Sequence, residues 1–292
     1  MDEFVEIEFE EELFSLLGVR KVNNPYLAYT TFRILEEFDS RFMSKTRFYK
    51  ILFLVYQRLK KRGINIQLPH FWYRWGDVIC ESSLPITIEY VHHGDRQIPQ
   101  VMQRPENGLE EDKKEKIDEI VKLAKQDLER KTADELIDEV YKFAPTKFQK
   151  EFREFKKYLD QGNLANASLK ISDLFASFPK DEFEELHPFF IRIVPLLRYG
   201  LEKRKFLDEL KELADLFWNV FCRKLAYLYN ENVPFNLVPF FEGKYKEGVV
   251  QLRDKIKEVE DLILDDFTEL SSESQSILEK HLEKFLESKG YL

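Results

Sequence analysis

Residues 46–63 read TRFYKILFLVYQRLKKRG, and this stretch decides the fold of the N-terminal part of the chain. Four of its apolar side chains recur at the spacing of one buried helix face: Phe48, Leu52, Val55 and Leu59. Apolar or aromatic residues at 51, 53, 54 and 56 fill much of the remaining circumference, which is typical of a helix buried on nearly all sides. Gly63 follows, and glycine ends helices readily because it tolerates the left-handed conformation. We therefore predict a central helix from Thr46 to Arg62.

Two further helices are predicted before the central one. The first covers about Asp2 to Leu17, is acidic and amphipathic, and ends at Gly18. The second runs from about Pro25 to Phe38, with Pro25 at the first helical position, which proline favours.

A small β-hairpin is predicted after the central helix. Apolar and polar residues alternate over Ile64–Leu68 and again over Ile86–His93, as they do in strands with one buried face. The sequence Gly94-Asp95-Arg96 then forms a turn before Gln97 and Ile98.

The composition changes near residue 100. Residues 98–111, IPQVMQRPENGLEE, contain two prolines and a glycine and lack a regular apolar pattern, which indicates a loop or linker. We place a domain boundary there, between a helical domain with the hairpin at 1–100 and a helical bundle at 109–292. The predicted fold class is therefore mainly α.

About seven helices are expected in the C-terminal part. Three of them begin at capping boxes, in which two side chains satisfy free amides reciprocally: Thr132 with Glu135, Thr146 with Gln149, and Ser272 with Gln275. Asn163 caps a helix that extends to about Phe178, and a long helix spans about Leu210 to Asn230. Residues 233–243 read as an apolar connection.

The composition also limits the class of protein. Hydrophobic residues make up 43% of the 292 residues, enough for a sizeable core, and the 34% of charged residues exceeds the roughly 25% of typical globular chains. No run approaches the ~20 apolar residues of a membrane span, and the acidic N-terminus differs from a secretory signal. Cys80 and Cys222 lie far apart without zinc-ligand spacing, so we expect a reduced, cytoplasmic protein that does not associate with membranes.

Charge is distributed unevenly along the chain. The window from Arg41 to Gly76 contains nine cations and no Asp or Glu, although the whole chain carries a net charge of −9. Cations in a last helical turn interact favourably with the helix dipole, but cations near the first turn do not. We therefore predict that this basic window contacts a partner molecule.

The aromatic run Phe71-Trp72-Tyr73-Arg74-Trp75 follows the basic helix and has two interpretations. Exposed Trp and Tyr beside Arg anchor protein partners or stack on bases, whereas the same residues turned inward would seat the central helix in its domain. Both interpretations stay open at this point. The predicted partner- or nucleic-acid-binding residues are Arg41, Lys45, Arg47, Lys50, Arg58, Lys60, Lys61, Arg62, Trp72, Arg74 and Trp75.

Two segments of this region resemble the SocA-like antitoxin domain, also called Panacea. Lys50-Ile51-Leu52-Phe53-Leu54 is similar to the K-L-L-Y-F-type helix of that family, and Tyr73-Arg74-Trp75-Gly76-Asp77-Val78 to its W-K-Y-G-P-V-type signature. Asp77 stands where the family has proline, and Tyr73 where it has tryptophan. The resemblance covers about residues 26–80 and implies a mostly helical module that neutralises a partner protein by direct contact.

Motifs for catalysis and for cofactors are absent from the sequence. It contains no phosphate-binding loop, no GxGxxG, no GxSxG and no HExxH motif, so we assign no catalytic residue, metal ligand or cofactor. The pair His92-His93, followed by Asp95, is the best isolated candidate for a metal or hydrolase site. Adjacent residues of a strand face opposite sides, however, so both rings would reach one metal only at a bend.

Three functions follow from these observations. The first is a non-enzymatic interaction protein, antitoxin-like or part of a prokaryotic defence assembly, that binds its partner through the basic aromatic face. The second is a winged-helix-like regulator that binds nucleic acid, with the hairpin near Gly94 as the wing. The third, which we rank last, is a metal-dependent hydrolase around His92 and His93.

Overall fold

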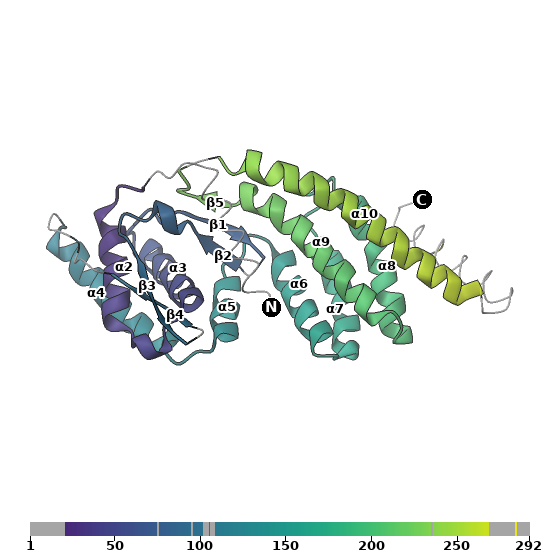
Figure 1. Ribbon diagram of the computed structural model, residues 1–292, viewed down its shortest axis with the longest axis horizontal. Coiled ribbons are helices and arrows are strands. Elements are labelled where there is room, and N and C mark those ends of the chain that lie inside the picture. The colour runs from purple at the N-terminus through teal and green to yellow at the C-terminus, as the bar shows by residue number, and fades with distance from the viewer. Residues whose placement is uncertain are drawn as a thin grey trace. The chain divides into compact units, whose positions relative to one another are not determined.

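The computed structural model describes residues 21–74, 76–94, 96–101, 105, 109–234, 236–268 and 284. The helix predicted at Asp2–Leu17 and the capping box of Ser272 and Gln275 lie outside these residues. Within them the protein is mainly helical, with nine α-helices and two small antiparallel sheets, as predicted (Figure 1). None of the helices described is both long enough and apolar enough to cross a membrane.

The chain divides into two compact units. Unit 1 comprises Met1–Lys150 and Cys222–Tyr245, and unit 2 comprises Glu151–Phe221 and Lys246–Leu292. The divisions fall inside three helices: α6 (Lys147–Asp160), α9 (Leu207–Leu228) and α10 (Val238–Thr268). The boundary predicted between residues 100 and 109 does not coincide with any of them, because the helices that follow it pack into unit 1.

Helix α3 (Lys45–Lys61) is the centre of unit 1. Ten of its 17 residues are buried, and its predicted bounds are confirmed to within one residue. Three helices pack against α3 (Figure 1): α2 (Pro25–Glu37), α4 (Glu111–Leu128) and α5 (Ala133–Tyr141). Helices α2 and α4 also pack against each other. Pro25 occupies the first turn of α2, where the Asn24 side chain accepts hydrogen bonds from the backbone amides of Tyr26 and Leu27.

A three-stranded sheet with the order β2-β1-β5 completes the core of unit 1. Its strands are β1 (His70–Tyr73), β2 (Gly76–Ile79) and the two-residue β5 (Asn230–Glu231). In the antiparallel register, His70 lies opposite Ile79 on one side and Glu231 on the other. Phe71, Trp72 and Tyr73 are all buried, and the indole of Trp72 meets the Phe53 ring edge to face at 5.9 Å. The aromatic run therefore seats α3 in the core, and Trp75 lies outside the described residues.

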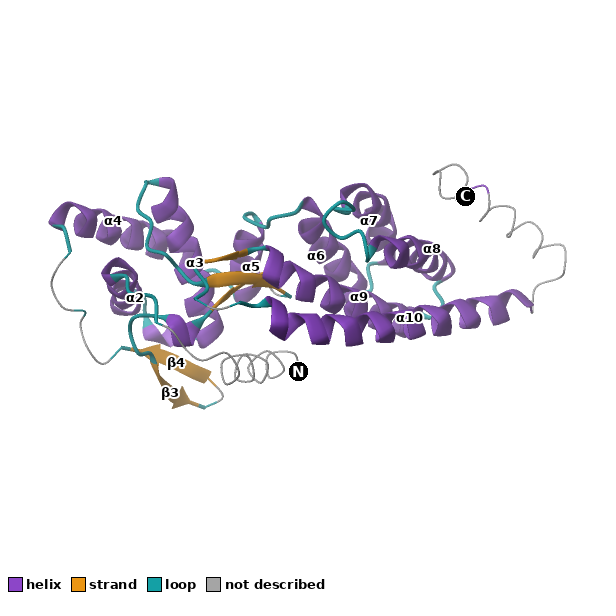
Figure 2. Ribbon diagram, turned by 90° about the horizontal axis from the view of Figure 1, so that it is seen from above, coloured by secondary structure: helices purple, strands orange, loops and turns teal. Residues whose placement is uncertain are grey.

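The predicted hairpin is confirmed as β3 (Glu89–His93) and β4 (Arg96–Gln100), with Val91 opposite Ile98. Figure 2 shows these two strands apart from the other sheet. Residues 64–68 form no strand. The burial in this segment nevertheless alternates: Ile64, Ile66 and Leu68 are buried, whereas Asn65 and Gln67 are exposed. The sequence pattern thus predicted which side chains are buried, but not the absence of strand pairing.

Unit 2 contains α7 (Leu164–Ser177), α8 (His187–Lys203) and the greater part of α6, α9 and α10. Stacked aromatic rings fill its core, among them Phe178 on Phe190 at 4.5 Å and Phe183 on Phe221 at 4.1 Å. The predicted Asn163 cap is confirmed, since its side chain accepts a hydrogen bond from the backbone amide of Asn166.

Two local predictions in the C-terminal part have mixed outcomes. The capping boxes at Thr132 and Thr146 are both present, and in each the two side chains bond reciprocally. The apolar connection predicted at 233–243 is only half irregular, because α10 begins at Val238 and buries Phe241 in unit 1.

Candidate functional site

The predicted binding residues do not all lie on the surface. Lys50 and Trp72 are buried, with 7% and 4% of their surface exposed. The Lys50 ammonium donates a hydrogen bond to the backbone oxygen of Asp77 at 2.7 Å, which satisfies the charge inside unit 1. Arg74 lies in the turn between β1 and β2, and its carbonyl accepts a hydrogen bond from the Tyr141 hydroxyl.

The other cations of the basic window fall into two groups at opposite ends of α3. Arg41, Lys45 and Arg47 lie at or before its first turn, whereas Arg58, Lys60, Lys61 and Arg62 lie at its last turn. At a rise of about 1.5 Å per residue, the 17-residue helix that separates the two groups is roughly 25 Å long, and its middle is buried. The window therefore forms two basic regions, not one continuous face.

Side chains from later in the chain neutralise much of the second group. Arg58 pairs with Asp127 at 3.0 Å and Lys60 with Glu231 at 2.8 Å. The Lys61 ammonium lies over the Phe143 ring, 4.9 Å from its centroid. These contacts, together with the helix dipole, account for cations at this end of α3.

Arg41 and Arg47 of the first group line a groove of about 1230 Å³ in unit 1, whereas Lys45 pairs with Glu81 at 3.2 Å. One wall is the 3₁₀ turn η1 (Ser40–Phe42) with the start of α3, and the other is the segment Glu129–Thr132 that follows α4. Ile98 of β4 also lines it. The groove thus joins parts of the chain that are about ninety residues apart.

The turn at η1 presents an aromatic ring and a cation side by side. Phe42 is 54% exposed although it is large and apolar, and the Arg41 guanidinium lies over its ring at 5.8 Å. Arg41 also donates to both carboxylate oxygens of Asp39. Hydrogen bonds from the Arg41 side chain and backbone amide lower the pKa of Asp39 to about 2, so this carboxylate is ionised at neutral pH.

Cations outnumber carboxylates in the groove. Four line it, namely Arg41, Arg47, Arg130 and Lys131, against the two carboxylates of Asp39 and Glu129. Lys131 pairs with Glu139 at 2.8 Å. Arg130 is exposed and forms no ion pair with any residue in the described part of the chain. The groove is therefore locally basic on a protein of net charge −9.

The contacts of Arg47 account for a cation at the N-terminal end of α3, where the dipole of α3 itself disfavours positive charge. Its guanidinium donates to the backbone oxygen of Glu129 at 2.8 Å and to that of Lys131, at the C-terminal end of α4. The charge thus satisfies free carbonyls and the dipole of a neighbouring helix. Lys125 of α4 does the same for the backbone oxygen of Glu37, the last residue of α2.

Sequence reasoning found Arg41 and Arg47 but missed Phe42, Arg130 and Lys131. No local signal marks Phe42, because a single aromatic residue before a helix is usually buried. Arg130 and Lys131 sit beside the Thr132 capping box in an acidic part of the chain, and only the fold brings them to Arg41.

The histidine pair forms no metal site within the described residues. His92 is exposed on β3, and no three His, Cys, Asp or Glu side chains of the part described lie close enough together to hold a metal ion. Cys80 and Cys222 are both buried, and no disulfide joins them.

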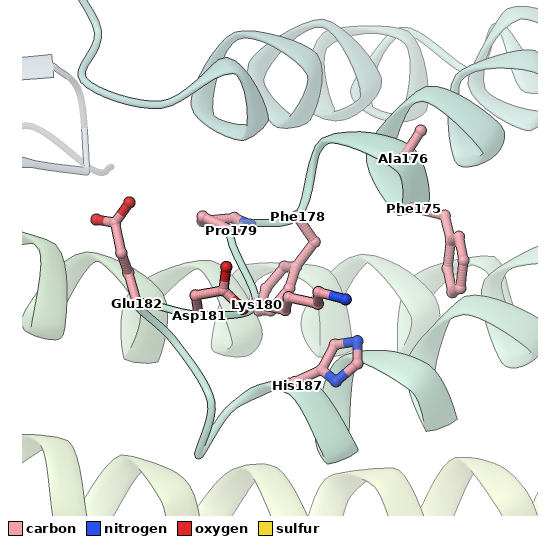
Figure 3. Close-up of a pocket in the computed structure, with 8 residues that line it drawn as sticks. All are labelled: Phe175, Ala176, Phe178, Pro179, Lys180, Asp181, Glu182 and His187. Atoms are coloured by element: carbon pink, nitrogen blue, oxygen red, sulfur yellow. The ribbon is translucent and has the colours of Figure 1, made fainter. Parts of the chain in front are cut away.

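A smaller pocket of about 390 Å³ lies in unit 2. Figure 3 shows the side chains of Lys180 and His187 next to each other, with Asp181 and Glu182 on the other side of the loop. Burial, together with the charge of Lys180, lowers the pKa of His187. One lysine among two carboxylates defines no class of ligand, so the groove in unit 1 is the stronger candidate site.

Comparison with known proteins identifies no relatives. No family model, no curated protein and no solved structure matches the chain. The resemblance to the SocA-like antitoxin domain stays a prediction, and the function is argued from the groove alone.

Proposed function

We propose that the protein is a non-enzymatic interaction module that binds an acidic segment of a protein partner in the groove of unit 1. The observation that carries this proposal is the exposed pair of Phe42 and Arg41 beside Arg130, which forms no ion pair with any described residue. Aromatic residues and arginine are enriched at the energetic centres of protein interfaces. The excess of cations gives the groove a potential that favours carboxylates and disfavours a basic partner.

The same geometry supports a protein ligand over a nucleic acid. A winged-helix protein reads bases with the exposed side chains of its second helix. Here α3 holds that position in the chain and is buried on nearly all sides, so it offers few side chains to a groove of DNA. The hairpin β3–β4 follows where a wing would stand, and we therefore keep nucleic-acid binding as an outcome of the test.

The resemblance to SocA-like antitoxins suggests the class of partner. In that form of the proposal the partner is a toxin or a subunit of a prokaryotic defence complex, and its acidic surface enters the groove. A cytoplasmic location goes with this proposal, because two buried cysteines that form no disulfide suit a reducing compartment.

The test begins with affinity purification of the tagged chain from its native host and re-expression of the protein that co-purifies. The affinity of the pair is then measured by calorimetry for the wild type and for the double variant Phe42→Ala, Arg130→Glu. We expect at least a tenfold loss of affinity in the variant, and weaker wild-type binding at higher salt. The matched control is Lys61→Glu, Arg62→Glu at the other end of α3, which should bind as the wild type does.

Two results would overturn the proposal. One is unchanged affinity in the groove variant while its melting temperature is preserved. The other is tight binding of duplex or single-stranded nucleic acid at about 50 mM salt that the groove variant abolishes, since phosphate contacts are strongest at low salt.

A further inference from the structure

A buried pair of ionisable side chains links β1 to β2 in unit 1. The His70 and Asp77 side chains are 3% and 0% exposed, and His70 Nδ1 and Asp77 Oδ1 share a hydrogen bond. His70 Nε2 and Asp77 Oδ2 are both buried without a hydrogen-bond partner in the described structure. Burial also raises the pKa of Asp77, against the charges of His70 and Lys50.

The segment that lies beside His70, on the side of β1 away from Asp77, is short and lightly held. Residues 229–234, which we call the strap, leave the end of α9, and Asn230 and Glu231 form its two ladder pairs with β1. The Trp72 amide donates to the backbone oxygen of Tyr229 at 3.1 Å, and the Asn232 side chain donates to that of Leu68 at 3.1 Å. Asn232 has a left-handed backbone with φ of 55°, which asparagine tolerates better than most residues.

Glu231 is the main side-chain attachment of the strap. Its carboxylate accepts hydrogen bonds from the Tyr56 hydroxyl at 2.6 Å and from the Lys60 ammonium at 2.8 Å. Burial raises the pKa of Glu231, but the hydrogen bonds from Lys60 and Tyr56 outweigh it, so the net shift is downward. The same carboxylate lies 3.9 Å from His70 Nε2, and its own side chain is 44% exposed. One partly exposed carboxylate thus lies next to His70 Nε2 and ties the strap to α3.

Glu231 of the strap lies 3.9 Å from His70 Nε2, and the Phe53 and Tyr56 rings of α3 pack against the same imidazole at 5.3 and 5.4 Å. A buried polar atom without a partner in the described structure, such as this Nε2, costs free energy that is recovered when water reaches it. Local opening is cheapest where few apolar contacts are lost, and Asn230 and Asn232 of the strap are exposed. The closed state is therefore stabilised mainly by the contacts of Glu231 and by the short backbone pairing of β5 with β1.

We propose that residues 229–234 open and close as a strap beside His70, with Glu231 as the latch. The open state gives solvent access to Nε2 of a ring whose Nδ1 shares a hydrogen bond with Asp77, and leaves an edge of β1 unpaired. This inference does not depend on the groove, which lies at the other end of α3.

Chemical labelling of His70 tests the strap directly. Diethyl pyrocarbonate transfers an ethoxycarbonyl group to the accessible imidazole nitrogen that holds the lone pair. The ring then loses the proton of its other nitrogen, and ethanol and carbon dioxide are released. Peptide mass spectrometry then gives the labelling rate of each histidine in the folded chain. His92 is exposed on β3 and serves as the internal reference.

We expect His70 to label at least about a hundredfold more slowly than His92 in the wild type, and Glu231→Gln to raise its rate about tenfold or more. The Gln side chain keeps the size of Glu but loses the charge that Lys60 holds. Tyr56→Phe removes one hydrogen bond and should act in the same direction. Arg62→Met at the same end of α3 is the matched control and should leave the rate unchanged.

Low concentrations of urea separate local opening from global unfolding. A strap that opens locally gives a His70 rate nearly independent of urea below the unfolding transition, because little surface is exposed. The proposal is overturned if the rate rises in parallel with global unfolding. It is equally overturned if both variants label His70 as slowly as the wild type does.

Discussion

The Arg47 guanidinium donates a hydrogen bond to the backbone oxygen of Glu129 at 2.8 Å, across 82 positions of sequence. The donor stands in the first turn of α3 and the acceptor is the C-cap of α4. One side chain thus fixes how the start of the central helix meets the end of its neighbour. It also holds the wall of the groove that carries Arg130.

Replacing Arg47 with Met should destabilise unit 1. The variant keeps most of the apolar stem but leaves the carbonyls of Glu129 and Lys131 without their charged donor, which costs about 1–3 kcal/mol. Urea unfolding measures the loss. Arg62→Met, at the exposed C-cap of α3, should change stability by less than ~0.5 kcal/mol. Equal stability of the two variants would contradict this role.

The pair of Asp39 and Arg41 should be visible in an acid titration. The pKa of Asp39 is lowered to about 2 from an ordinary 3.8, so the folded state binds this proton less tightly than the unfolded state does. The stability that the pair contributes is complete above about pH 4 and is lost as the pH falls towards 2. NMR titration of the Asp39 carboxyl carbon measures the shift. In Arg41→Ala the pKa should return towards 3.8, and an unchanged midpoint would refute the pairing.

Phe178→Ala should destabilise unit 2. The ring is 9% exposed and stacks on Phe190 at 4.5 Å and on His187 at 5.6 Å. Removing a buried phenylalanine ring costs about 3–5 kcal/mol. Urea unfolding measures this loss of stability. The control is Leu169→Ala in the same unit, since Leu169 is 74% exposed. Access of water to the emptied site should also raise the pKa of His187 towards its ordinary 6.5, which ¹H NMR can follow.

Local signals in the sequence predicted the helices of this protein well. Pro25, Gly63 and Asn163 each act on the residues beside them, and the helices they bound begin or end within a residue or two of the prediction. The capping box of Thr132 and Glu135 is equally local, because both partners lie in one turn.

The hairpin β1–β2 escaped prediction because it gives no alternating pattern. All four residues of each strand are buried, and a run of this kind does not distinguish a strand from a helix. The backbone at Gly76 also requires a glycine, for a reason that only the folded structure shows. Its φ is 101°, and a Cβ atom there would come within 3.0 Å of the Val140 side chain.

Non-local contacts limited the prediction of the site. The proline-containing segment at 98–111 reads as a boundary, yet it connects parts of a single unit. Arg58 and Lys60 looked available to a partner because their neutralising carboxylates, Asp127 and Glu231, lie about 70 and 170 residues further along. Sequence alone cannot report such distant pairing.

Two helices of unit 1 are capped by side chains from neighbouring helices: Arg47 of α3 caps α4, and Lys125 of α4 caps α2. These contacts limit which segments of the chain can be separated from one another. A fragment that stops at residue 100 keeps the central helix but strips it of the covering that α4 and α5 provide. The first hundred residues therefore lack part of the covering of their own core, and we expect a segment that folds by itself to include the later helices and the strand at 230–231.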